Sequence, residues 1–300
     1  MSKVCFCMLA FNSDWVLSPV LDLIEQYGPV VIAEGPVKYW QDQGYTTSTD
    51  KTNAIIEAHR LDPSTDIQVI HGQWPEKDEM QRALESMIPD DTTHVWIVDA
   101  DETYKRDALE GILCALDTCD AVSFKARSFW AGFRKWIGGF EAEYEVQRVM
   151  RWYPGATFET HRPPTVLSKD GKPFQDMLHI DSAMTSYGGL FMYHYSYVFP
   201  RQVKMKAQYY HDRDPNGTIP HWFENVYLPW ASGARADLWG ELYRLEQRHQ
   251  GVHNWRPERR NATFTNWFEG RHPANIEAAI PQLQARFDAE LAECLKEIRG

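Results

Sequence analysis

The sequence predicts an α/β fold in which a mainly parallel sheet is flanked by helices, with a helical extension toward the C-terminus. Over the first 127 residues, short apolar runs rich in β-formers alternate with segments of helical periodicity. An acidic sequence directly follows one of the apolar runs, and from residue 127 to 199 the helical period gives way to dense aromatics. Strands that alternate with helices favour a parallel sheet with right-handed crossovers.

The elements follow in order from the N-terminus. Val4–Ala10 is the first apolar run, and Ser18 and Pro19 then provide an N-cap and a proline for the first turn of a helix that ends at Gly28. The same alternation continues as a strand at 29–33, a helix at 53–59, a strand at 67–71, a helix after Pro75, a strand at 94–98, a helix at 105–116 and a strand at 121–126.

The second half does not repeat this alternation. Short runs at 146–152 and 190–199 are typical of strands, and 201–210 predicts a helix. A turn-rich segment at 212–220 precedes two amphipathic helices, expected at 234–249 and 274–299. We therefore expect a helical extension after about residue 215.

Composition excludes several classes of protein. An apolar fraction of 43% indicates a globular chain, and a net charge of −11 disfavours nucleic acid as a partner. Five cysteines without Cys-x-x-Cys spacing suggest reduced core thiols. No apolar run reaches the roughly 18–20 residues that span a bilayer, so we expect no transmembrane segment. The first residues do not resemble a signal peptide, which predicts a cytoplasmic protein.

The strongest chemical signal is an acidic sequence at the end of a predicted buried strand. His94–Val98 leads directly into Asp99-Ala100-Asp101-Glu102. Ligands gather at the carboxyl ends of parallel strands, and two carboxylates spaced i, i+2 can converge on Mg²⁺ or Mn²⁺. The alternative is that these acids cap the N-terminus of the next helix.

Four segments in this order resemble the glycosyltransferase family 2 group, which has the GT-A fold. They are 4–12, 30–35, 76–84 and 96–102, the last of which is similar to the family's aspartate motif. The resemblance covers residues 3–210. It implies a catalytic domain at 1–215, with a nucleotide-sugar half at 1–127 and an acceptor half at 128–215, followed by the helical extension at 216–300.

The resemblance also implies a nucleotide-diphosphosugar donor, with a UDP-sugar as the expected form, and a divalent cation held by Asp99 and Asp101. The cation would stabilise the leaving diphosphate as a Lewis acid. His194 is the candidate third ligand, although it could equally be a histidine packed in an aromatic strand. Arg201 and Lys206 either face the donor phosphates or lie on a solvated helix face. The candidate donor-binding residues are Phe11, Asn12, Glu34, Lys77, Arg82, Asp99 and Lys204.

Inverting transfer needs a base that takes the proton of the acceptor hydroxyl. Glu159, two residues before His161 in a proline-stiffened loop, is the main candidate, and Asp181 is the alternative. Either acid could also be a loop residue without a catalytic role. The aromatic region suggests an acceptor platform that includes Trp130 and Trp136, with His161 nearby, although ordinary core packing explains most of these rings equally well.

These observations predict a metal-dependent, inverting glycosyltransferase of the hexosyltransferase type. The acceptor is expected to be a glycan or another hydroxyl compound. The sequence contains no P-loop, no Gly-x-Gly-x-x-Gly, no nucleophile elbow and no His-Glu-x-x-His, and no Gly-rich nucleotidyltransferase loop follows the first strand. Two alternatives stay open: a carbohydrate-binding or scaffold protein without turnover, and a transferase that modifies a hydroxymethylated DNA base.

Overall fold

The computed structural model describes residues 2–215, 220–232, 258–259 and 263–299. The chain forms two compact units that interleave along the sequence. The first comprises Met1–Ala126, Tyr144–Tyr193 and His272–Glu277. The second comprises Arg127–Glu143, His194–Arg271 and Ala278–Gly300. Each is described by itself.

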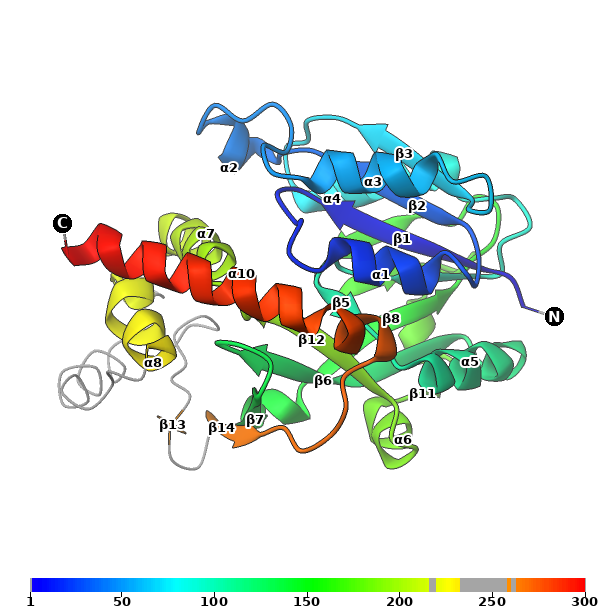
Figure 1. Ribbon diagram of the computed structural model, residues 1–300. Helices are drawn as coiled ribbons and strands as arrows, with labels where there is room; N and C mark the ends of the chain where they lie inside the picture. The colour runs from blue at the N-terminus through cyan, green and yellow to red at the C-terminus, as the bar shows by residue number, and fades with distance from the viewer. Residues whose placement is uncertain (1, 216–219, 233–257, 260–262, 300) are drawn as a thin grey trace. The chain divides into compact units, whose positions relative to one another are not determined.

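The first unit contains a mainly parallel sheet. Strands β3 (Ile67–His71), β2 (Val30–Glu34) and β1 (Val4–Ala10) are parallel neighbours in that order (Figure 1). Strand β4 (His94–Ile97) pairs in parallel with the other edge of β1. Strand β8 (Glu145–Arg151) runs antiparallel between β4 and β6, a strand at Ala121–Trp130. A short strand, β11 (His179–Ile180), pairs in parallel with β6. The predicted α/β class with a mostly parallel sheet is therefore confirmed.

Helices and short strands connect these β-strands. The helices are α1 (Leu17–Ile24), α2 (Lys38–Gln41), α3 (Thr52–Arg60), α4 (Lys77–Arg82) with a 3₁₀ turn at Ala83–Met87, α5 (Arg106–Ala115) and α6 (Ser182–Tyr187). The short strands are β5 (Glu102–Thr103), β9 (Phe158–His161) and β10 (Pro164–Val166).

One predicted cap is wrong. The helix α1 begins at Leu17 with Val16 as its N-cap, so Ser18 lies inside the helix. Its hydroxyl instead lies 3.2 Å from Nε2 of His59 on α3. The Ser18 hydroxyl therefore contacts a residue of another helix, whereas the sequence pattern predicted that it would cap α1.

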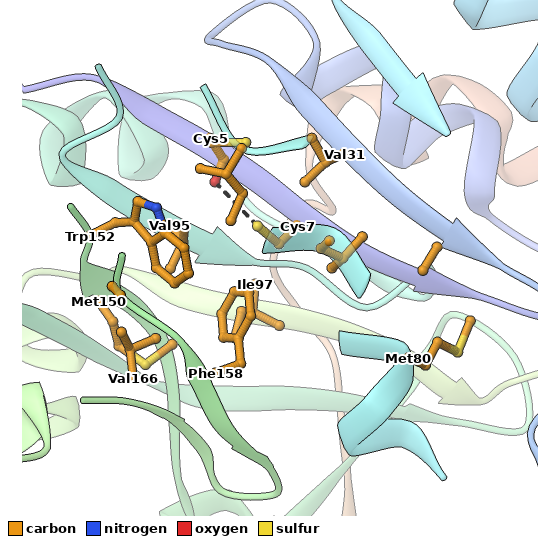
Figure 2. Packing of buried hydrophobic residues seen from close by; sticks show 14 of the residues in the cluster. Cys5, Cys7, Val31, Met80, Val95, Ile97, Met150, Trp152, Phe158 and Val166 are labelled. Carbon is orange, nitrogen blue, oxygen red and sulfur yellow. Dashed lines mark hydrogen bonds between the residues drawn. The ribbon is translucent and has the colours of Figure 1, made fainter. Parts of the chain in front are cut away.

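A hydrophobic core on one face of the sheet holds the segments that later form the site. It joins strand residues such as Cys7 of β1 and Ile97 of β4 to Met80 of α4 and Phe158 of β9. Figure 2 shows Cys7, Ile97 and Phe158 near one another, with Met80 of the same cluster further along the core. Met80 and Phe158 are buried in this core together with Cys7 of β1 and Ile97 of β4. The helix α4 and the strand β9 are therefore packed against β1 and β4.

The second unit combines strands and helices. Its strands β13 (Glu258–Arg259), β14 (Thr263–Trp267) and β7 (Lys135–Gly139) are antiparallel neighbours, and β12 (Phe191–Tyr197) enters the unit at His194. Its helices are α7 (Pro200–Arg213), a π-helical turn at Phe223–Tyr227, α8 (Leu228–Ala231) and most of α10 (Ala274–Arg299).

The predicted helix at 274–299 is present as α10. Arg201 and Lys204 of α7 pair with Glu293 and Glu297 of this helix. The strands β13 and β14 were not predicted, because periodicity pointed only to helices after residue 215. The helix expected at 234–249 lies outside the described residues. Within the described ranges, no helix is long and apolar enough to cross a membrane.

Candidate functional site

The acidic sequence forms a turn at the carboxyl end of β4. Val98 N–H donates to the carbonyl of Cys7 at 3.0 Å, which extends the pairing of β4 with β1 by one residue. The amide of Glu102 then donates to the carbonyl of Asp99 at 2.9 Å, and the amide of Asp99 donates to the Glu102 carboxylate at 3.3 Å. The next helix, α5, starts only at Arg106 with Lys105 as its N-cap. These acids therefore do not cap a helix.

A buried arginine neutralises two of the acids. Arg148 of β8, which is 6% exposed, donates through Nε to Glu102 at 2.8 Å and through Nη2 to both Glu102 and Asp99, the latter at 3.1 Å. Glu102 is only 1% exposed. Burial would lower the pKa of the Arg148 guanidinium, but the adjacent carboxylates of Glu102 and Asp99 raise it well above its usual range. Arg148 is therefore held in its charged form.

Asp99 remains a carboxylate well below neutral pH. Burial and the negative charge of Asp101 act to raise its pKa. The positive charges of Arg148 and Arg162 outweigh them and hold the pKa well below its ordinary range, and Nη2 of Arg162 lies 3.7 Å from Asp99 Oδ2. Asp101 is half-buried beside this charge network. The turn thus presents two neighbouring carboxylates with cationic side chains close by.

His161 sits next to this turn as a neutral imidazole. Its amide donates to Asp78 at 2.8 Å, and its Nδ1 lies 3.2 Å from the amide oxygen of Gln81, both on α4. Its Nε2 is buried and has no hydrogen-bond partner. Burial, together with the nearby positive charges of Lys77 and Arg162, lowers the pKa of His161 to about 3.

This depressed pKa makes stability depend on pH. An unfolded histidine titrates near ~6.5, so between about pH 6.5 and 3 the unfolded chain binds a proton that the folded chain does not. We expect the free energy of unfolding to fall as the pH drops through this window, by about 1.4 kcal/mol per pH unit from this group. In urea titrations from pH 7 to 4.5, His161→Gln should flatten the decline. Equal slopes in both proteins would contradict the neutral buried state.

Three predicted donor-binding residues gather at the carboxyl ends of β1 and β2. Glu34, fully buried, accepts from the amide of Ser48 at 2.8 Å and from Nδ1 of His71 at 2.9 Å. Burial opposes these hydrogen bonds, which nevertheless lower the pKa of Glu34. Asn12 accepts from the amide of Thr49 at 2.8 Å. Both side chains therefore bind the 47–49 loop, so the Glu34 carboxylate and the Asn12 amide oxygen already have protein partners.

An aromatic group borders the same edge. Phe11, the third of these residues, lies 5.8 Å from Trp40 and 5.5 Å from Tyr45 between ring centroids. All three side chains are partly exposed. Such rings can stack on a planar base.

The predicted residues of α4 have different surroundings. Arg82 donates to the carbonyls of Phe158 at 3.2 Å and Glu159 at 2.9 Å, so it joins α4 to β9. Lys77 contributes positive charge near His161. The helix thus places Lys77 near His161, and Arg82 holds β9.

The two candidate bases lie on different elements. Glu159 is exposed on β9, two residues before His161. Asp181 is the N-cap of α6 and accepts from the amide of Met184 at 2.8 Å. The carboxylate of Asp181 is therefore engaged in a capping bond, whereas Glu159 presents its side chain to solvent.

The remaining predicted residues belong to the second unit. Trp130 is fully buried among Trp222, Tyr227 and Trp230, and Trp136 has the guanidinium of Arg127 4.1 Å from its ring centroid. Lys204 pairs with Glu297 at 2.7 Å, and Lys206 donates to Ser196. His194 lies on β12 with Nδ1 3.4 Å from the Ser128 hydroxyl. The third-ligand role of His194 and the acceptor roles of the two tryptophans stay predictions.

Sequence reasoning missed Arg148, Gln81 and Asp78. Arg148 had one weak signal: it precedes the apolar pair Val149 and Met150 in a predicted strand, and a cation buried in a strand requires a partner. Gln81 and Asp78 lie on the polar face of α4. The sequence pattern does not indicate which residues of such a face contact another segment.

Comparisons with known proteins give weak likenesses. No protein-family model matches the chain, and no curated protein does. Among solved structures, S. aureus TarS is similar with a TM-score of 0.40 and 12% identity over 82% of this chain and 50% of that one. A complex of S. aureus TarS 1-349 with UDP-GlcNAc has a TM-score of 0.34 and 16% identity, and the match covers 42% of this chain and 35% of that one. The 4-diphosphocytidyl-2C-methyl-D-erythritol synthase of Anaerococcus prevotii has a TM-score of 0.31 and 11% identity, and the match covers 50% of this chain and 71% of that one.

The chain spans between about a third and half of the length of these TarS structures. With scores this low, assignment of an activity rests on the residues of this chain.

Proposed function

We propose that this chain is a nucleotide-sugar-dependent glycosyltransferase of the kind that the family 2 resemblance implies. One observation carries the proposal: the parallel strand β4 ends in a turn where ionised Asp99 lies near Asp101 and beside Arg148 and Arg162. The position is the one where α/β sheets bind ligands. Carboxylates and guanidinium groups side by side suit a ligand that combines a divalent cation with phosphates.

The donor set fits a hard divalent cation. Asp99 is ionised, and its Oδ2 accepts a hydrogen bond from Arg148. The negative charge of Asp101 repels that of Asp99. A cation held by both carboxylates would relieve that repulsion, and oxygen ligands suit Mg²⁺ or Mn²⁺. When bound, such an ion supplies Lewis-acid stabilisation of a diphosphate leaving group.

The cations of the protein act on the same charge. As the bond between the anomeric carbon and the phosphate breaks, negative charge grows on the nucleoside diphosphate. Arg162, whose side chain is 59% exposed, can turn toward that charge while Arg148 stays locked to Glu102. Lys77 adds a third positive charge on this side of the sheet. In this account, Phe11 and its aromatic neighbours take the nucleobase.

Deprotonation of the acceptor is assigned to Glu159. Its carboxylate is exposed and lies on the strand that also carries His161. Asp181, the other candidate, is engaged in the cap of α6. Attack by the deprotonated acceptor hydroxyl on the face of the sugar opposite the diphosphate inverts the anomeric centre.

The activity is tested most broadly by a donor-hydrolysis screen. The full chain is incubated with a panel of nucleotide sugars and Mn²⁺, and release of the nucleoside diphosphate is measured without an acceptor. We expect slow hydrolysis of one or a few donors, with a UDP-sugar among them, and loss of the signal with EDTA. Donor binding without any turnover in the presence of candidate acceptors would instead identify a carbohydrate-binding protein.

A further inference from the structure

A second group of metal-ligating side chains lies between α1 and α3 of the first unit. Ser18, Asp22 and Glu25 follow one another at i, i+4 and i+7 and so share one face of α1 and its C-cap. His59 lies in the last turn of α3. Asp22, Glu25 and His59 each offer a ligand atom, and these atoms lie within 4.8 Å of one another. It is the one such group of three among the described residues.

The imidazole is held in a defined orientation. Nδ1 of His59 lies 2.7 Å from Oε2 of Glu25, and the two side chains are 11% and 16% exposed. A carboxylate at Nδ1 fixes the ring proton there and leaves the lone pair on Nε2. Metal-ligating histidines are commonly oriented in this way by a carboxylate on their other nitrogen.

Two side-chain oxygen atoms lie near the other ring nitrogen, Nε2. Nε2 of His59 lies 3.9 Å from Oδ1 of Asp22 and 3.2 Å from Oγ of Ser18. Two ligands bound at about 2.1 Å to a tetrahedral ion lie roughly 3.4 Å apart. The Asp22 side chain is 58% exposed, so a small rotation closes the difference, and water can reach the ion from its side.

The surrounding charge also favours a cation. Two carboxylates stand beside a single imidazole. Glu25 is the C-cap of α1 and His59 belongs to the last turn of α3, so both lie at the negative ends of helix dipoles. These features are independent of the turn at Asp99.

We propose that this group binds a first-row divalent metal ion, with Zn²⁺ as its preferred probe. Nε2 of His59 and the carboxylate of Asp22 are the ligands, and Glu25 is a positioning residue. The imidazole distinguishes this site from the all-oxygen pair at Asp99 and Asp101, because nitrogen ligands suit Zn²⁺ and disfavour Mg²⁺. A bound ion would link α1 to α3, two helices of the first unit that pack against each other.

The test is a calorimetric titration of the full chain with Zn²⁺ in an Asp101→Asn background, which weakens binding at the other site. We expect one equivalent of Zn²⁺ that a millimolar excess of Mg²⁺ does not displace. His59→Gln should abolish this binding. Glu25→Gln should weaken it by roughly 10–100-fold, because it keeps the shape but lowers the basicity of the ligand.

His71→Gln is the matched control. His71 also has a carboxylate at Nδ1, that of Glu34 at 2.9 Å, but belongs to no three-residue group of this kind in the described chain. It should leave Zn²⁺ binding unchanged. Equal binding by His59→Gln and the parent, or equal loss in His71→Gln, overturns the site.

Folding is tested separately. If His59→Gln does not fold, the exposed Asp22→Asn variant replaces it, with visible absorption of bound Co²⁺ as the readout. An affinity at least tenfold lower in Asp22→Asn supports the site, and an unchanged Co²⁺ spectrum and affinity refute it. The outcome does not depend on whether the chain transfers sugar.

Discussion

Replacement of Arg148 by methionine is expected to lower the free energy of unfolding by about 3–5 kcal/mol. The reason is the pair of acids that Arg148 compensates, since Glu102 is 1% exposed and Asp99 is largely buried. A hydrophobic side chain of similar length fills the space, but it removes the cation that buried Glu102 contacts and leaves Asp99 with the exposed Arg162 at 3.7 Å as its nearby cation. Urea or thermal unfolding monitored by circular dichroism measures the loss.

A control lies on the same strand. Arg151 pairs with Asp120 at 2.6 Å but is 36% exposed, so Arg151→Met should cost less than about 1 kcal/mol. Adding Glu102→Gln to the Arg148 variant should recover part of the lost stability, because it removes one uncompensated charge. A loss below about 1 kcal/mol in the single variant would show that the network does not stabilise the turn.

The largest effect on activity is expected for Asp101→Asn. The change keeps the size of the side chain but removes a charged oxygen ligand from the proposed cation site. Loss of one such electrostatic contribution typically costs roughly 10²–10³-fold in turnover. Because Asp101 is only half-buried and asparagine keeps its shape, stability should change little. Turnover of the best donor from the hydrolysis screen, measured with Mn²⁺, gives the result.

Asp107→Asn is the matched control. Asp107 is an exposed acid in the first turn of α5, six residues further along the chain, and its side chain contacts the amide of Ala108. It should keep full activity. Equal activity of Asp101→Asn and Asp107→Asn would remove Asp101 from the site.

Much of the first unit could be predicted because its signals are local. Val4–Ala10 and residues 30–33 are apolar throughout, since a central parallel strand is covered on both faces, and both strands appear as predicted to within a residue. The acids after His94–Ile97 could be placed at a strand end for the same reason. The fold then brings that end beside β8 and β9, an arrangement that no local pattern describes.

The partners within the site could not be predicted, because they are distant in sequence. Arg148 and Glu102 are 46 residues apart, and His161 and Gln81 are 80 apart. Each pair forms only because β8 lies next to β4 and because α4 packs against β9. Asp181 shows the converse: its capping bond to Met184 is local, but the sequence pattern suggested this acid only as a candidate base.

The density of aromatic residues predicted core packing, but it did not identify which rings are exposed enough to meet a ligand. Trp130 lies within a cluster of rings at centroid distances of 5.1–6.0 Å and has no exposed surface. Composition alone does not distinguish such a core ring from a ring that meets a sugar, because both have the same apolar faces.

The most direct test is isothermal titration of the protein with the donor chosen by the hydrolysis screen, with and without Mn²⁺, in the parent chain and in Asp101→Asn. We predict that the parent binds the donor at least tenfold more tightly when Mn²⁺ is present, and that Asp101→Asn loses this difference. Donor affinity that is the same without metal and survives the substitution would contradict the account.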